Sequence, residues 1–241
     1  MARVPEPVPA IAGMLLLLLC SACERPDFDS ARQAYEAGDY EQAFEVLRPL
    51  ARSGDAKSQN TLGYMYQYGQ GVEQDYALAL QWYRKAGEQG VARARLNLGH
   101  LYHEGVSVER NYVEAVSWYR QAAAQGLADG RYSLGYMYEM GYGVIQDYIE
   151  AAEWYYKAAK QGHVRAQYSL GLMYFRGYAV PRSDLQAYAW LGVASAGGYK
   201  PAHQLRDTIG LRMTEPQLQK ARARARELWG KYGNKAGDAP E

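Results

Sequence analysis

The chain has 241 residues, of which 48% are hydrophobic and 22% are charged, and its formal net charge is +1. This length suits one or two domains, and the composition excludes an intrinsically disordered, collagen-like or polytopic membrane protein. The nearly neutral charge removes the electrostatic argument for a nucleic-acid-binding protein, which needs a basic surface.

An apolar segment at residues 10–19 lies shortly before Cys23. It is too short to span a bilayer, which requires about 20 residues, but it has the length of the apolar core of a secretory signal. Ser21-Ala22-Cys23 resembles the end of a bacterial lipobox, in which the bond before the cysteine is cleaved and the thiol is lipidated. The resemblance implies a signal peptide over residues 1–22, a lipidated Cys23 and a tether over residues 23–30. A simply cleaved signal, and an uncleaved apolar tail on a cytosolic protein, are the alternatives.

An internal repeat with a period of 36 residues dominates the rest of the chain, and such a period is the signature of a repeat architecture. The recurring residues are Gly63, Gly99, Gly135 and Gly171; Tyr66, Tyr102, Tyr138 and Tyr174; Ala79, Ala115, Ala151 and Ala187; Trp82, Trp118, Trp154 and Trp190; and Gly90, Gly126, Gly162 and Gly198. We therefore predict four tandem units, over residues 56–91, 92–127, 128–163 and 164–199. The repeats contain no cysteine, so no disulfide framework is possible there.

Each unit is predicted to form a pair of helices, as the first unit shows. Residues 56–68 carry an apolar stripe at three- and four-residue spacing, and Gly69 and Gly71 end this helix because glycine tolerates the left-handed conformation. The second helix covers residues 76–89, and its tryptophan fills the gap between adjacent pairs. Tyrosine rings between stacked helices are buried while their hydroxyls reach a polar partner, which explains 23 tyrosines against 3 phenylalanines.

Capping residues mark the start of the second helix in every unit. The N-cap positions are Asp75, Asn111, Asp147 and Ser183, whose side-chain oxygens accept free amide hydrogens. Three residues later come Glu114, Glu150 and Gln186, which predict reciprocal capping boxes in three of the four units.

These residues carry a resemblance to the Sel-1-like repeat, a relative of the tetratricopeptide repeat. The matching pattern in the first unit is Leu62-Gly63-x-x-Tyr66-x-x-Gly69-x-Gly71-Val72-x-x-Asp75-x-x-x-Ala79-x-x-Trp82-Tyr83-x-x-Ala86-x-x-x-Gly90. The resemblance covers residues 56–199, and it departs mainly in the fourth unit, where Asp184 and Leu191 replace tyrosines. It implies an all-α, right-handed solenoid of antiparallel helix pairs.

Capping elements are predicted on both sides of the repeats. Residues 31–55 resemble a tetratricopeptide helix pair and form the N-terminal cap. Residues 200–232 form the C-terminal cap, with a second helix that opens at Thr214-Glu215-Pro216, where proline is tolerated. Residues 233–241 are predicted to be a disordered tail.

The concave face of a solenoid is lined mainly by the first helix of each unit. Alignment with the tetratricopeptide pattern implies that the groove positions are Asn60, Tyr64 and Gln67; Leu96, His100 and His103; Tyr132, Tyr136 and Glu139; and Tyr168, Leu172 and Phe175, with Lys57, Arg93 and Arg165 at one lip. These positions vary between units while the packing positions do not, which indicates a surface freed from packing. Such an aromatic groove with cationic edges can anchor a protein segment; a merely solvated inner face is the alternative.

Two further patterns are better explained as ordinary surface features. His100 and His103 share a helix face, but two ligands are too few for a closed zinc site, so we expect no metal and no cofactor. The basic run 220–226 alternates with alanine, and side chains two residues apart on a helix point about 200° apart. Its charges therefore spread around a solvated capping helix rather than forming a nucleic-acid or lipid contact.

No enzyme signature is present. There is no phosphate-binding glycine loop, nucleophilic serine elbow or plausible carboxylate pair. One branch of Sel-1-like repeat proteins resembles penicillin-handling enzymes, but that branch carries a cysteine pair in each repeat and this chain does not. A hydrolase of this branch is the remote alternative.

The sequence thus predicts a non-catalytic adaptor of the bacterial cell envelope that binds an envelope protein in its groove. The predicted partner-binding residues are Tyr64, Gln67, Arg93, His100, His103, Tyr132, Tyr136, Glu139, Tyr168 and Phe175. Since aromatic rings also stack on sugars, and since the chain resembles alginate-export lipoproteins, binding of a cell-wall or exported polysaccharide is the alternative. The predicted location is the periplasmic side of the outer membrane, with a soluble periplasmic or secreted form as the alternative.

Overall fold

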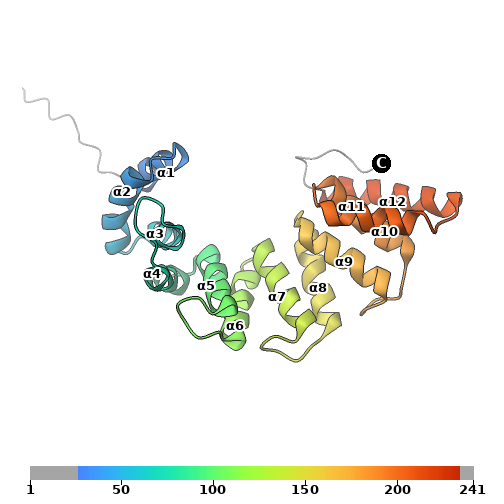
Figure 1. The fold of residues 1–241 in the computed structure, drawn as a ribbon, viewed down its shortest axis with the longest axis horizontal. Coiled ribbons are helices and arrows are strands. Elements are labelled where there is room, and N and C mark those ends of the chain that lie inside the picture. Colours follow the sequence, from blue (N-terminus) through green and yellow to red (C-terminus); the bar gives the residue numbers. More distant parts are fainter. Residues whose placement is uncertain (1–26, 234–241) are drawn as a thin grey trace, which may run out of the picture.

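A computed structural model describes residues 27–233, which form twelve α-helices and no strand (Figure 1). The helices are α1 (Phe28–Glu36), α2 (Tyr40–Arg52), α3 (Ala56–Tyr68), α4 (Tyr76–Glu88), α5 (Ala92–Glu104), α6 (Tyr112–Ala124), α7 (Ala128–Met140), α8 (Tyr148–Ala159), α9 (Val164–Arg176), α10 (Asp184–Ala196), α11 (Lys200–Gly210) and α12 (Glu215–Tyr232). The predicted signal peptide, Cys23 and residues 234–241 of the predicted tail lie outside the described residues.

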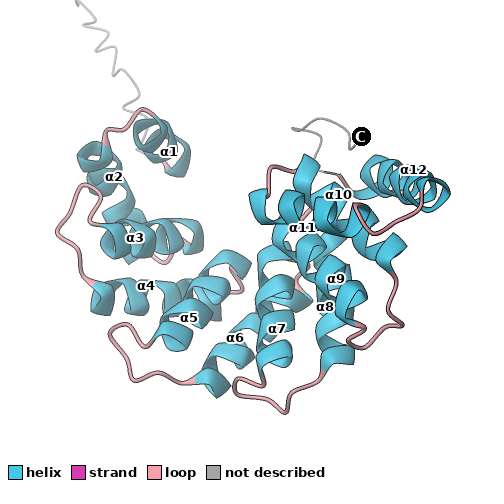
Figure 2. Cartoon of the chain, turned by 45° about the vertical axis from the view of Figure 1, so that its right-hand side comes forward, coloured by secondary structure: helices cyan, strands magenta, loops and turns pink. Residues whose placement is uncertain are grey.

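The helices follow one another as antiparallel pairs along an open arc, as Figure 1 and the cartoon in Figure 2 show. The second helix of each pair also contacts the first helix of the next pair. The odd-numbered helices of the repeats, α3, α5, α7 and α9, lie along the inner side of the arc (Figure 1). This arrangement confirms the predicted all-α repeat solenoid.

The recurring glycine in each first helix allows the second helix to approach closely. A Cβ atom on Gly135 would lie 2.8 Å from the Tyr155 ring, which is fully buried. The equivalent Tyr83 and Tyr119 lie over Gly63 and Gly99 in the first two units, and Leu191 takes the place of the tyrosine over Gly171. The tryptophans pack against the preceding pair, as predicted: Trp118 of α6 lies against the core formed by α4 and α5.

The predicted helix N-caps are confirmed, but the predicted capping boxes are wrong. Asn111 accepts a hydrogen bond from the amide of Glu114 at 3.1 Å, and Asp75, Asp147 and Ser183 do the same in their units. The reciprocal bond needs the N-cap amide as donor, yet the Asn111 amide already donates to the carbonyl of Tyr102 at 2.9 Å. The recurring tyrosine column supplies this carbonyl in every unit, so a glutamate side chain has no free amide to bind.

Helix α1 begins at Phe28, within the segment predicted as the tether. The cause is a capping box, in which Asp27 accepts from the Ser30 amide at 2.9 Å and the Ser30 hydroxyl accepts from the Asp27 amide at 3.1 Å. Phe28 packs against the core formed by α1, α2 and α3. At the other end, α12 begins and ends as predicted and packs against α10, which closes the solenoid.

Candidate functional site: the concave face

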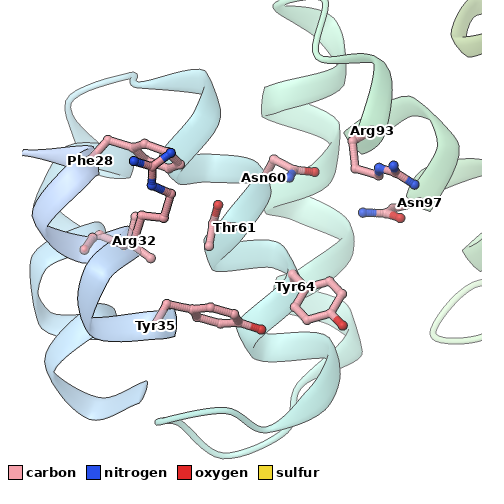
Figure 3. Close-up of a pocket in the computed structure, with 10 residues that line it drawn as sticks. Phe28, Arg32, Tyr35, Asn60, Thr61, Tyr64, Arg93 and Asn97 are labelled. Carbon is pink, nitrogen blue, oxygen red and sulfur yellow. The ribbon is translucent and has the colours of Figure 1, made fainter. Parts of the chain in front are cut away.

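Two adjoining hollows lie on the concave face. The N-terminal hollow has a cavity volume of about 410 Å³ and lies between α1, α3 and α5 (Figure 3). The central hollow has a cavity volume of about 470 Å³ and lies against α5, α7 and the start of α9. Arg93 and Asn97 of α5 line both hollows, so the two form one continuous surface, which we call the groove.

About half of the predicted groove and lip residues line a hollow: Asn60, Tyr64, Arg93, Leu96, His100, Tyr132 and Arg165. The others lie outside both hollows: Lys57, Gln67, His103, Tyr136, Glu139, Tyr168, Leu172 and Phe175. Lining residues that the sequence analysis missed include Phe28, Arg32, Tyr35, Asn97, Asp129 and His163. Phe28 was missed because residues 23–30 were assigned to the tether, and Arg32 and Tyr35 were missed because the helix pair at residues 31–55 was expected only to cap the repeats.

A chain of polar side chains crosses the central hollow and links α5, α7 and the residue that caps α9. Arg93 of α5 pairs through its guanidinium with Asp129 of α7, and the second Asp129 oxygen lies 3.3 Å from His163 Nε2. The hydrogen bond from His163, and then the pairing with Arg93, lower the pKa of Asp129 to about 2. The sequence carried a signal for this contact, because Arg93 and Asp129 have opposite charges at equivalent positions of adjacent repeats.

His163 is fixed in one tautomer by its two contacts. Its Nδ1 accepts a hydrogen bond from the amide of Ala166 at 3.1 Å and thereby caps α9, while Nε2 carries the proton that faces Asp129. The imidazole also stacks on the ring of Tyr132, with 4.6 Å between the ring centroids. The histidine therefore has a positioning role at the wall of the groove, and no nitrogen is left free to act as a base.

Three predicted groove residues hold the hydroxyls of buried tyrosines. Gln67 accepts from Tyr83 at 2.7 Å, Glu139 accepts from Tyr155 at 2.6 Å, and His100 Nδ1 lies 2.9 Å from the Tyr119 hydroxyl. Burial, and then the negative charge of Glu139, raise the pKa of Tyr155 well above its ordinary value, so this hydroxyl remains a donor. Burial also lowers the pKa of His100, which favours the neutral ring.

These contacts correct the inference that the variable positions are freed from packing. Each of the three acceptors satisfies the hydroxyl of a buried tyrosine, and buried polar groups need such partners. In the fourth unit the tyrosine is replaced by Leu191, and the two acceptor positions are the apolar Leu172 and Phe175. The variation between units is therefore compensated within each unit. The predicted roles of these positions in partner binding stay predictions.

The remaining predicted residues form aromatic clusters at the edges of the groove. His103 lies beside Tyr112, Tyr136 and Tyr142, and its buried Nε2 has no hydrogen-bond partner among the described residues. Burial lowers the pKa of this histidine. Toward the C-terminal end, Tyr168 packs against Tyr199 at 5.0 Å between ring centroids. The Arg212 guanidinium lies 5.2 Å from the centroid of the Phe175 ring.

Residues 27–233 contain no helix that is both long and apolar enough to cross a bilayer. In the same range, no three His, Cys, Asp or Glu side chains come together in a way that could hold a metal ion. The groove offers aromatic rings, amides, imidazoles and charged side chains of both signs.

Comparison with known proteins identifies the family. The Sel1 repeat model matches residues 56–91, 92–127, 128–163 and 164–199. The crystal structure of a Sel1 repeat protein from Oxalobacter formigenes is 33% identical, with a TM-score of 0.71 over 86% of each chain. The immunity protein Pa5087 from Pseudomonas aeruginosa shares the fold, with a TM-score of 0.51 over 84% of this chain and 80% of that chain at 19% identity. No curated protein shows significant similarity to this chain. Sel1 repeat proteins are typically protein–protein interaction scaffolds and are generally non-catalytic. The chain belongs to the Sel1 repeat family.

Proposed function

We propose that this protein is a non-catalytic adaptor of the bacterial cell envelope, and that it binds a partner protein in the groove. The observation that carries the proposal is the continuity of the groove, whose two hollows extend from α1 to the start of α9 and share Arg93 and Asn97. The ring of Tyr64 lines it and is 38% exposed. An extended groove with exposed aromatic anchors suits the binding of a chain segment.

The location is part of the proposal. The lipobox-like Ser21-Ala22-Cys23 supports lipidation at Cys23 and attachment to the periplasmic side of the outer membrane. Cys23→Ala should abolish labelling by an acyl-chain analogue and release the protein from membranes. Labelling lost without release would indicate a second membrane contact, and unchanged labelling would refute lipidation at this residue.

Capture of partners from cross-linked envelope extract, read by mass spectrometry, tests the adaptor. The groove variant is Tyr64→Ala with Arg165→Ala, because neither residue accepts a hydrogen bond from a buried hydroxyl. The control is Tyr156→Ala with Arg226→Ala, which removes a tyrosine that is 44% exposed and an arginine from outside both hollows. His100 is kept, since its replacement would leave the Tyr119 hydroxyl without a partner.

A protein recovered by the native chain and the control, but not by the groove variant, is the expected result. Equal recovery by all three chains, or no recovery, would refute the adaptor. The adjoining rings of Tyr64 and Tyr68, 38% and 54% exposed, also form a surface on which a sugar can stack. Saturable binding of peptidoglycan fragments or envelope polysaccharide, lost with the same groove variant, would then favour the glycan-binding alternative.

A further inference from the structure

We propose that the N-terminal hollow is a binding site for an extended peptide segment in which a large apolar side chain is followed or preceded closely by an aspartate or glutamate. This inference rests on the proposed adaptor function and names the chemistry of its partner. The hollow opens on the concave face between α1 and α3, and α5 forms its far wall (Figure 3).

The apolar preference follows from the walls of the hollow. Phe28 and Tyr35 of α1 and Tyr64 of α3 line it with aromatic rings, and Ala31 and Leu47 add aliphatic surface. Its volume of about 410 Å³ lies near the lower end of the range of about 300–1,000 Å³ that is common for ligand sites. A hollow of this size accepts one or two side chains of an extended segment and is too small for a folded surface.

The acidic preference follows from the charged residues that line the hollow, both of which are cationic: Arg32 of α1 and Arg93 of α5. Arg32 pairs with Asp29 at 3.3 Å and with Glu36 at 3.9 Å, but all three side chains are mostly exposed, and such pairs are weak. Arg93 uses Nη1 to pair with Asp129, which leaves its other guanidinium donors for a ligand. A carboxylate on the ligand would therefore meet the guanidinium groups of Arg32 and Arg93, and no aspartate or glutamate of the described residues lines the hollow to repel it.

The preference for a peptide backbone follows from two amides on neighbouring helices. In Figure 3 the side chains of Asn60 on α3 and Asn97 on α5 face one another across the groove. The Asn60 Oδ1 atom is buried and has no hydrogen-bond partner among the described residues. An extended peptide offers alternating N–H donors and C=O acceptors, which suit two such amides. An acyl chain offers neither group, and a neutral sugar carries no charge that could pair with the guanidinium groups of Arg32 and Arg93.

Binding of fluorescein-labelled octapeptides to the purified chain, measured by anisotropy, tests the proposal. The peptides are glycine–serine scaffolds with Leu, Phe or Trp at the fourth position and Glu, Gln or Lys at each neighbouring position in turn. We expect the best peptide with glutamate to bind at least ten-fold more tightly than its lysine counterpart. It should also bind at least ten-fold more tightly than the same peptide with serine at the fourth position.

Two variants place the binding in this hollow. Arg32→Glu should weaken binding of the glutamate peptide at least five-fold and reduce its advantage over the lysine peptide. Its matched control is Arg48→Glu, because Arg48 also pairs with a carboxylate three residues away, at 3.0 Å, and lies outside the hollow. Thr61→Phe should fill the hollow and weaken binding at least ten-fold, with circular dichroism to verify that the helices are retained.

The possible contrary results separate this inference from the adaptor function. Equal binding of glutamate and lysine peptides, equal effects of Arg32→Glu and Arg48→Glu, or no binding of any peptide at about 1 mM would overturn the proposed specificity. The adaptor would still stand if the envelope capture recovers a partner that depends on the groove. Conversely, octapeptide binding with the expected pattern would support the inference even if that capture recovers no protein.

Discussion

Replacing Tyr155 with phenylalanine and Glu139 with leucine, singly and together, measures how strongly the concave side of α7 is tied to the core. Tyr155 is fully buried on α8, and its hydroxyl donates a 2.6 Å hydrogen bond to Glu139 of α7. Glu139 is half-buried at the rim of the concave face. Each single change leaves one partner of the pair behind, whereas the double change removes both.

The expected magnitudes follow from burial and charge. A hydrogen bond to a charged acceptor contributes about 1.5–3 kcal/mol. Tyr155→Phe should cost about 1.5–2 kcal/mol, since the carboxylate that remains is half-buried and regains water. Glu139→Leu should cost about 2 kcal/mol, since it removes the charged acceptor of a buried hydroxyl. The double variant should lose about 2 kcal/mol rather than the sum, which gives a coupling energy of about 1.5 kcal/mol.

Urea unfolding of the four proteins, followed by far-ultraviolet circular dichroism, provides the four free energies. Equal m values are required, since repeat arrays can unfold in parts. Tyr83→Phe is the matched control for charge, because Tyr83 is equally buried but donates to the neutral Gln67 at 2.7 Å. It should cost about 1 kcal/mol. Additive effects at Tyr155 and Glu139, within about 0.3 kcal/mol, would refute the view that this pair couples the concave side of α7 to the core.

Three further changes test the backbone and the chain of polar side chains across the central hollow. Gly71→Ala should destabilise the protein by at least about 2 kcal/mol in urea unfolding, because Gly71 has φ +66° and an added Cβ would overlap the carbonyl of Tyr40. Ala179→Gly, at an equivalent position with φ +61°, should instead stabilise it by about 0.5 kcal/mol; a loss of stability would contradict this account. When the pH is lowered from 4 to 2, the Asp129 carboxyl binds a proton in the unfolded chain, whereas in the folded chain its pKa of about 2 keeps it charged. The folded state therefore loses stability as the pH decreases. The full shift would correspond to about 2.4 kcal/mol, but the carboxyl is 41% exposed, so we expect about 1 kcal/mol. Asp129→Asn should remove this part of the acid sensitivity, and an unchanged pH profile would contradict the role assigned to the pair with His163.

The repeat architecture was predictable because the same packing problem recurs in every unit. Gly135 faces Tyr155 as Gly63 faces Tyr83, and so a single steric constraint appears in the sequence as two columns with one period. The capping boxes were mispredicted because the deciding contact is not local. The Asn111 amide is already bonded to a carbonyl of the preceding helix, and a four-residue pattern carries no information about that bond.

The groove was harder to predict because variation between repeats has two different causes. At some positions the side chain changes together with its partner, as when Tyr119 is held by His100 and Tyr155 by Glu139. At other positions the polar side chain has no hydrogen bond or ion pair among the described residues, as at Arg165, which also lines the central hollow. In the sequence both kinds of position appear as variable columns. Only the side-chain contacts in the structure distinguish one kind from the other. Positions of the second kind are the ones at which we expect a change to alter binding without altering the core, which is why Arg165 belongs in the groove variant and Glu139 does not.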